Sequence, residues 1–121
     1  MATLADVRRI ALSLPGAEAA PDGFSFSILV KQKPKGFAWV WKERVVPKKP
    51  RIPNPSVIAV RVANNTVKDM MMSAEPGKYV VDPHYDGYPA VLVRLSKVRV
   101  PELRTLLTDS HRTLAPRPKR A

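Results

Sequence analysis

The sequence predicts an α+β fold in which helices pack against one antiparallel five-stranded sheet. Phe24, Phe26 and Ile28 alternate with serines, which is the period of a half-buried strand. Helical periodicity appears near both ends of the chain, over residues 3–14 and 101–114. Short turns between successive strands favour antiparallel pairing, so the expected order is one helix, three strands, a helix, two strands and a last helix.

The first helix is expected over residues 3–14. Thr3 caps its N-terminus, and Asp6 stands three residues later, at the position of a capping-box partner. Pro15-Gly16 ends the helix, and a loop follows over residues 17–23.

A β-hairpin is predicted next, with a basic turn over residues 31–36. After this turn the aromatic residues Phe37, Trp39 and Trp41 alternate with Ala38 and Val40, so the three rings are expected to share one strand face. Burial is the usual fate of such large rings. Trp41, which lies nearest the following loop, is the one expected to be partly exposed and available for stacking on a base.

Residues 42–55 are predicted to form an exposed loop with extended character, because four prolines remove backbone donors there. A strand follows over residues 57–62. Thr66 is expected to cap a short helix, with Asp69 at the capping-box position. A fourth short strand is expected over residues 79–81.

Residues 84–95 join a turn to the most apolar short run of the chain. Asp86-Gly87 supplies the turn because glycine tolerates positive φ, and the run that follows Pro89 predicts a strand covered on both faces. The last helix starts at Pro101. Residues 1–116 form the single predicted domain, and residues 117–121 are a basic tail expected to lack fixed structure.

The composition limits the possible functions. The chain has 121 residues and no cysteine, which excludes disulfides and thiolate metal sites. The N-terminal helical pattern carries charged residues and no uninterrupted apolar segment, so no secretory signal is recognised and a cytoplasmic protein without membrane association is expected. With no cysteine and no coiled-coil heptads, a monomer is expected. The net charge of +11 favours a polyanionic partner such as nucleic acid, although solubility alone also accounts for such a charge.

Basic residues gather around the predicted hairpin, with Glu43 as the only acid among them. The candidate phosphate-contacting residues are Lys31, Lys33, Lys35, Lys42, Arg44, Lys48, Lys49 and Arg51. Because they fall at the two ends of one strand, they form two clusters separated by a strand length. They predict either a surface that contacts phosphates and releases counterions, or a pair of solvated loops.

The richest local group of polar side chains is a possible ligand edge formed by His84, Tyr85 and Tyr88. The acids Asp82 and Asp86 flank His84, but the spacing matches no metal-binding motif, so no metal, no cofactor and no catalytic residue are assigned. We expect a hydrogen-bonded turn in which the Asp86 carboxylate accepts from nearby backbone.

Several segments together resemble the MmcQ/YjbR family. They are Leu14-Pro15-Gly16, Gly36-Phe37, Val60-Arg61-Val62-Ala63, residues 84–95, and Ala115-Pro116 after the last helix. The resemblance covers almost the whole chain and implies a compact domain with the element order given above, similar in topology to type III secretion chaperones. Residues 42–55 depart from the family pattern, because other members carry a more mixed-charge loop there.

The family is labelled DNA-binding and has no catalytic residues attached to it, so the resemblance implies a non-enzymatic binding module. DNA is expected before RNA, with contacts to phosphates and weak sequence preference. The alternative is a chaperone-like protein-interaction module that uses the sheet face or a groove near Tyr85 and Tyr88.

Overall fold

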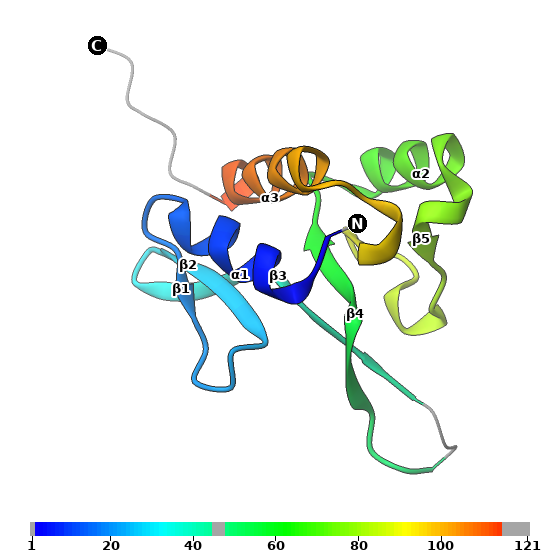
Figure 1. Ribbon diagram of the computed structural model, residues 1–121, viewed down its shortest axis with the longest axis horizontal. Helices are drawn as coiled ribbons and strands as arrows, with labels where there is room; N and C mark the ends of the chain where they lie inside the picture. The colour runs from blue at the N-terminus through cyan, green and yellow to red at the C-terminus, as the bar shows by residue number, and fades with distance from the viewer. Residues whose placement is uncertain (1, 45–47, 115–121) are drawn as a thin grey trace.

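The computed structural model describes residues 2–44 and 48–114, so the predicted tail at residues 117–121 lies outside the described residues. The helices pack with a single sheet in an α+β arrangement (Figure 1). The elements are α1 (Leu4–Ser13), β1 (Glu18–Ala19), β2 (Ser25–Val30), β3 (Lys33–Glu43), β4 (Ile52–Arg61), α2 (Asn65–Ala74), β5 (Tyr79–Val80), β6 (Ala90–Arg94) and α3 (Val100–Leu114).

The sheet has six strands in the order β1-β2-β3-β4-β6-β5, and every neighbouring pair is antiparallel. The antiparallel α+β prediction is therefore confirmed, but the count of five strands is wrong. The additional strand is β1, whose two residues pair with Ser27 and Phe26 of β2. Two residues carry no periodicity, so the sequence alone marked this segment as a loop.

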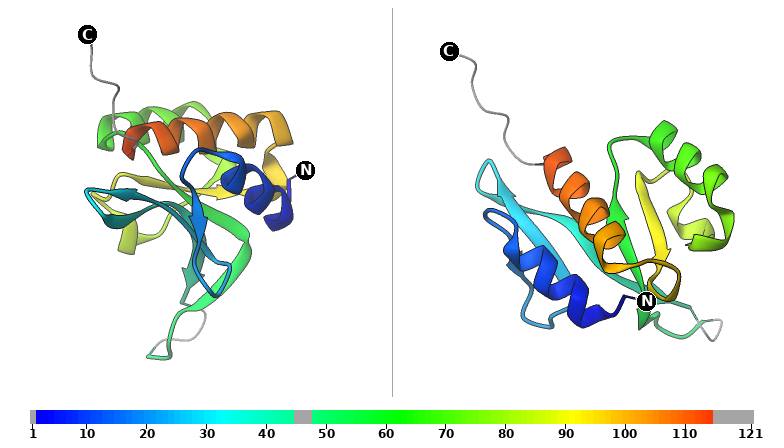
Figure 2. Two further views of the ribbon diagram at one scale, coloured as in Figure 1. Left: turned by 90° about the vertical axis from the view of Figure 1, so that its left-hand side faces the viewer. Right: turned by 45° about the horizontal axis from the view of Figure 1, so that its top comes forward.

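The helices α1 and α3 lie side by side across one face of the sheet, and α2 lies beyond them next to β6 (Figure 2). The main core fills the space between these helices and the sheet. Val7, Ile10, Leu103 and Leu107 from the helices meet Phe26, Phe37, Ile58 and Val93 from the strands, and all eight are fully buried. No helix in the described ranges has the length and apolarity that crossing a bilayer requires.

The caps follow local chemistry. The Thr3 hydroxyl accepts from the Asp6 amide while the Asp6 carboxylate accepts from the Thr3 amide, which confirms the predicted capping box of α1. The cap of α2 is Asn64 instead of Thr66, because the Asn64 side chain accepts from the Val67 amide at 2.9 Å.

Two irregularities shape β3. The hairpin turn is shorter than predicted: only Lys31 and Gln32 have positive φ, and pairing with β2 already begins at Lys33. A β-bulge then shifts the register between Phe26 and Ser27, and it leaves Phe37 as the additional residue on β3. The Phe37 ring consequently enters the main core and meets His111 of α3 edge-on at 5.7 Å between ring centroids.

The bulge is tied to α3 by a buried hydrogen bond from the Ser110 hydroxyl to the Phe37 carbonyl, 2.6 Å long. The next residue of α3, His111, has Nε2 2.6 Å from the Pro15 carbonyl, to which the ring nitrogen donates. Both side chains are buried, so the C-terminal half of α3 is anchored by polar contacts as well as by its leucines.

We predict that Ser110→Ala lowers the free energy of unfolding by about 1–2 kcal/mol, because the buried Phe37 carbonyl loses its side-chain donor. Thr105→Ala on the same helix is the matched control, since the Thr105 hydroxyl is exposed and bonds only within its own helix. Urea denaturation measures both variants. Equal stabilities for the two variants would show that the bond to the bulge contributes nothing.

Candidate functional site

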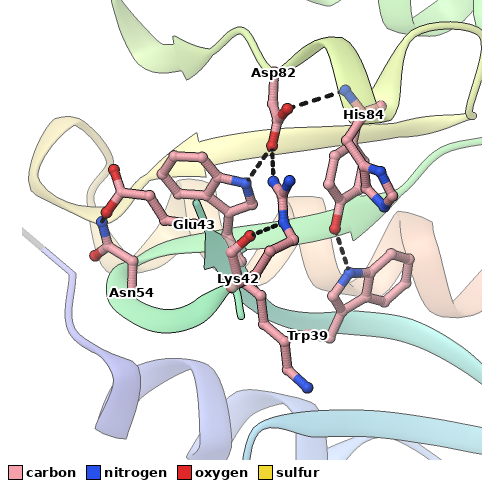
Figure 3. Close-up of polar contacts among 9 residues, drawn as sticks. Trp39, Lys42, Glu43, Asn54, Asp82 and His84 are labelled. Carbon is pink, nitrogen blue, oxygen red and sulfur yellow. Dashed lines mark hydrogen bonds and ion pairs between the residues drawn. The ribbon is translucent and has the colours of Figure 1, made fainter. Parts of the chain in front are cut away.

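The second face of the sheet, opposite α1 and α3, carries its own apolar cluster. Trp41, Val57, Ala59 and Leu92 are buried there, and Trp39, Val80 and Tyr85 pack against them. The cover is not a helix of several turns but the segment over residues 81–88, which contains the single-turn helix Pro83–Tyr85 (Figure 3). We call this segment the cover segment. It brings the predicted ligand edge onto the middle of the sheet.

The predicted aromatic row is divided between the two faces. Trp39 and Trp41 share the second face as expected, but Phe37 does not, because the bulge turns its side chain toward α3. The prediction of a partly exposed Trp41 is also wrong, since that residue is only 8% exposed. Trp39 is the half-buried ring of the pair and therefore the one with surface for a ligand.

Asp82, a residue of the cover segment, is the centre of a polar network between that segment and the sheet (Figure 3). Its Oδ2 accepts from Trp41 Nε1 at 2.9 Å and from Arg51 Nη2, and its Oδ1 accepts from the His84 amide at 3.0 Å. Arg51 Nε in turn donates to the Lys42 carbonyl at 2.7 Å. One carboxylate thus joins the cover segment to β3 and to the start of β4.

The pKa of Asp82 reflects two opposing influences. Burial of the carboxylate, which is 11% exposed, would by itself raise its pKa. The hydrogen bonds from Trp41 and the His84 amide, together with the Arg51 charge, outweigh burial and hold the pKa of Asp82 below its usual value. The ionised form is therefore the one the fold stabilises.

Two tyrosines of the cover segment hold the other indole and a neighbouring arginine. Trp39 Nε1 donates to the Tyr85 hydroxyl at 2.9 Å. Arg61 of β4 donates to the Tyr88 hydroxyl at 3.0 Å and to the Gly36 carbonyl at 2.8 Å. Its guanidinium lies 5.8 Å from the centre of the Trp39 ring and 5.6 Å from that of Tyr88.

His84 differs from its neighbours because its ring is exposed; within the described residues its aromatic partner is Tyr85, edge-on at 5.6 Å between centroids. The carboxylate that accepts a hydrogen bond from the backbone of this turn belongs to Asp82, so the prediction that the Asp86 carboxylate does so is wrong. Gly87 adopts the expected positive φ, which is 75°. Over residues 2–44 and 48–114 no three potential ligands gather into a metal site. His111, the second histidine, belongs to the helix-covered core instead.

The candidate phosphate-contacting residues form two separate clusters, as predicted. Lys31, Lys33 and Lys35 lie at the β2–β3 turn, and the others lie near the opposite end of β3. Seven residue steps separate Lys35 from Lys42, which corresponds to about 23 Å of extended strand. Residues 52–55, predicted as part of the loop, instead belong to β4 and pair with the end of β3 as far as Asn54.

The arginines and lysines of these clusters differ in what they contact. Arg51 is committed to Asp82 and to the Lys42 carbonyl, and Arg44 donates to the Lys49 carbonyl at 3.0 Å. The six lysines are exposed, and none of them appears among the ion pairs of the described part of the chain. These lysines are Lys31, Lys33, Lys35, Lys42, Lys48 and Lys49.

The importance of Arg61 and Asp82 was not predicted from the sequence. One feature of the sequence pointed toward Asp82: a buried tryptophan N–H usually needs a hydrogen-bond acceptor, and Asp82 is an acid next to a predicted strand of the same sheet. No comparable signal marked Arg61, whose partners are distant in sequence and come from β3 and the cover segment.

We predict that Asp82→Asn destabilises the protein by about 2 kcal/mol at neutral pH, because Arg51 loses its charged partner. The folded pKa is lower than the unfolded value of about 3.9, so this stabilisation is present above that pH and is lost as pH falls through the folded pKa. Denaturation curves at neutral and acidic pH measure it. The difference between wild type and variant should shrink in acid.

The control for this variant is Asp109→Asn, because Asp109 is an exposed acid of α3. This control should stay within about 0.5 kcal/mol of wild type at either pH. A difference between wild type and Asp82→Asn that is independent of pH would contradict the role assigned to the carboxylate charge.

No family model matches the chain. The crystal structure of Deinococcus radiodurans protein DR2400, which has a DUF419 domain, superposes with a TM-score of 0.62 at 20% identity, over 92% of this chain and 77% of that one. At this identity the similarity shows a shared fold.

The sequence relatives are the uncharacterized proteins Mb2600 of Mycobacterium bovis and Rv2570 of Mycobacterium tuberculosis. Each is 36% identical over 118 residues, which cover 97% of this chain and 92% of the relative. The chain therefore belongs to the same protein family as Rv2570 and Mb2600.

Proposed function

We propose that the protein is a non-enzymatic nucleic-acid-binding module of the MmcQ/YjbR type that contacts phosphates through exposed lysines at both ends of β3. Two findings support this type: the resemblance of the sequence segments described above, and the fold shared with a protein that has a DUF419 domain, which is YjbR/MmcQ-like. DNA is proposed before RNA because the resemblance points to DNA.

The observation that carries the proposal is the set of six exposed lysines without ion pairs in the described residues. The acid closest to them in sequence, Glu43, is half-buried and its carboxylate accepts a hydrogen bond from the Asn54 side-chain Nδ2 at 3.3 Å. These ammonium groups therefore meet solvent and counterions, and a polyanion that displaces the counterions gains binding free energy from their release.

The spacing of the two clusters suits an extended backbone. Their separation of about 23 Å corresponds to roughly seven successive phosphates along one nucleic-acid strand, at about 3.4 Å each. The helices α1 and α3 turn their apolar faces to the main core, where they serve the fold. Contacts of this kind position a protein on phosphates without reading bases, so the proposed binding has weak sequence preference.

Arg51 is left out of the proposed contacts because its guanidinium already bonds to Asp82 and to the Lys42 carbonyl. A protein partner docked near Tyr85 and Tyr88 is the alternative. We place it second, because both tyrosine hydroxyls already accept hydrogen bonds from within the chain.

We predict that replacing Lys33, Lys35, Lys42 and Lys49 by glutamine weakens binding to duplex DNA and flattens its salt dependence. Each phosphate contact contributes about −0.9 to the slope of log K against log salt concentration. If all four lysines contact phosphates, the slope becomes less negative by about 3.6. Fluorescence anisotropy over a series of salt concentrations measures it, with duplexes of different sequence affected alike.

The matched control replaces Arg94, Lys97, Arg99 and Arg104 by glutamine. These residues are also exposed, and both variants lower the net charge of +11 by four. If both variants lose the same DNA affinity, net charge alone accounts for the loss, and the proposed lysine surface is contradicted. Absence of DNA and RNA binding by the wild-type protein at low salt would contradict the proposed function as a whole and favour the protein partner.

A further inference from the structure

A pocket of about 290 Å³ opens on the second face of the sheet, between β2, β3 and the cover segment. Trp39, His84 and Tyr85 are aromatic residues of its lining, and Ser25 and Lys42 are also among its lining residues. We propose that this pocket accepts one unpaired base of a single-stranded nucleic acid. The inference rests on the proposed function and specifies its substrate class.

The chemistry of the lining fits a base. Bases stack on aromatic side chains whatever their sequence, because each base has a π face. The volume lies at the lower end of small-ligand pockets, which suits one flat ring system. In the part of the chain that the structure describes, the His84 ring and the Ser25 hydroxyl have no hydrogen-bond partner, so both are available to polar atoms on a base edge.

The pocket is organised before any ligand arrives. The indole of Trp39 is held by its bond to the Tyr85 hydroxyl and by the Arg61 guanidinium at 5.8 Å from its ring centre. Arg51 is fixed by Asp82 and the Lys42 carbonyl (Figure 3). Few side chains must be ordered on binding, so little of the stacking free energy is spent on conformational entropy.

The position of the pocket connects it to the lysines. Trp39 lies on β3 between Lys35 and Lys42, hence between the two clusters. Lys42 is itself among the lining residues of the pocket, so a phosphate next to the inserted base can contact a lysine of the second cluster. In a duplex the bases are paired and stacked, and entry of one base would require it to be flipped out at a cost of a few kcal/mol. The arrangement therefore favours single strands.

The test compares two fluorescein-labelled probes with equal numbers of phosphates, an oligothymidylate and a mixed-sequence duplex, at one salt concentration. Trp39→Leu should lose about tenfold in affinity for the oligothymidylate, within the range measured for base–aromatic stacking, and keep its affinity for the duplex. His84→Ala should show a smaller loss in the same direction. Trp39→Phe, which keeps an aromatic face, should retain most of the single-strand affinity.

A second readout uses the protein's own fluorescence. The chain has two tryptophans, and Trp41 is buried, so quenching on binding the oligothymidylate reports a base stacked on Trp39. The duplex should produce little quenching. Because the His84 side chain makes no hydrogen bond within the described residues, His84→Ala is expected to fold even if Trp39→Leu does not.

The outcomes separate the two proposals. If wild type binds neither probe, the phosphate-contacting function itself is overturned. If wild type binds both probes, and Trp39→Leu or His84→Ala leaves oligothymidylate affinity and tryptophan quenching unchanged, only the pocket is overturned. A selective loss of single-strand affinity, with duplex binding intact, supports the pocket.

Discussion

Both faces of the central strands are apolar, but the long helices α1 and α3 cover only one of them. Trp39 and Trp41 place two large rings on the other face, together with Ala59 and Leu92. This face cannot remain bare, and its two indole N–H groups each require an acceptor, because an unsatisfied buried donor costs about 1–3 kcal/mol. The cover segment meets both requirements, since Tyr85 and Asp82 supply one acceptor each. The remaining features of this face follow from that need for cover.

One consequence is that the basic residues near the end of β3 differ in what they contact. Asp82 is partly buried and ionised, so it needs a counter-charge, and Arg51 provides it while also bonding to the Lys42 carbonyl. A planar guanidinium suits this work because it donates in several fixed directions at once. The flexible lysines remain in solvent, where their ammonium groups keep their hydration. Position within the network, and not charge alone, separates a cation that stabilises the fold from one that can bind a ligand.

Local patterns predicted the parts of the fold that depend on neighbouring residues. The capping box at Thr3 and Asp6, the strand after Pro89 and the last helix all rest on spacing within a few residues. The errors lie where distant contacts decide. The bulge at Phe37 is defined by pairing with β2 and bonds to Ser110, which lies 73 residues away, and β1 exists only because β2 is there to pair with it. At the site, the sequence identified the lysines, His84 and Tyr85 by type. It did not predict that Trp39 is half-buried while Trp41 is buried, because burial of these rings depends on contacts with the cover segment, which is distant in sequence.

Under the proposed function, the lysines and the pocket depend on salt in different ways. The contribution of counterion release falls steeply as salt rises. Each phosphate contact contributes about −0.9 to the slope of log K against log salt concentration on a duplex, and about −0.7 on a single strand. Stacking on Trp39 is a short-range contact between a base and a half-buried ring, and screening leaves it nearly unchanged. On this proposal the lysines dominate at low salt, and the protein is expected to bind duplex and single strand alike. As salt rises the contribution of the lysines declines and that of stacking persists. The preference for a single strand should therefore grow with ionic strength even as both affinities fall. Lysines alone have no such second contribution, so in the proposed binding mode the cover segment, which the fold needs to protect two tryptophans, also provides the discrimination.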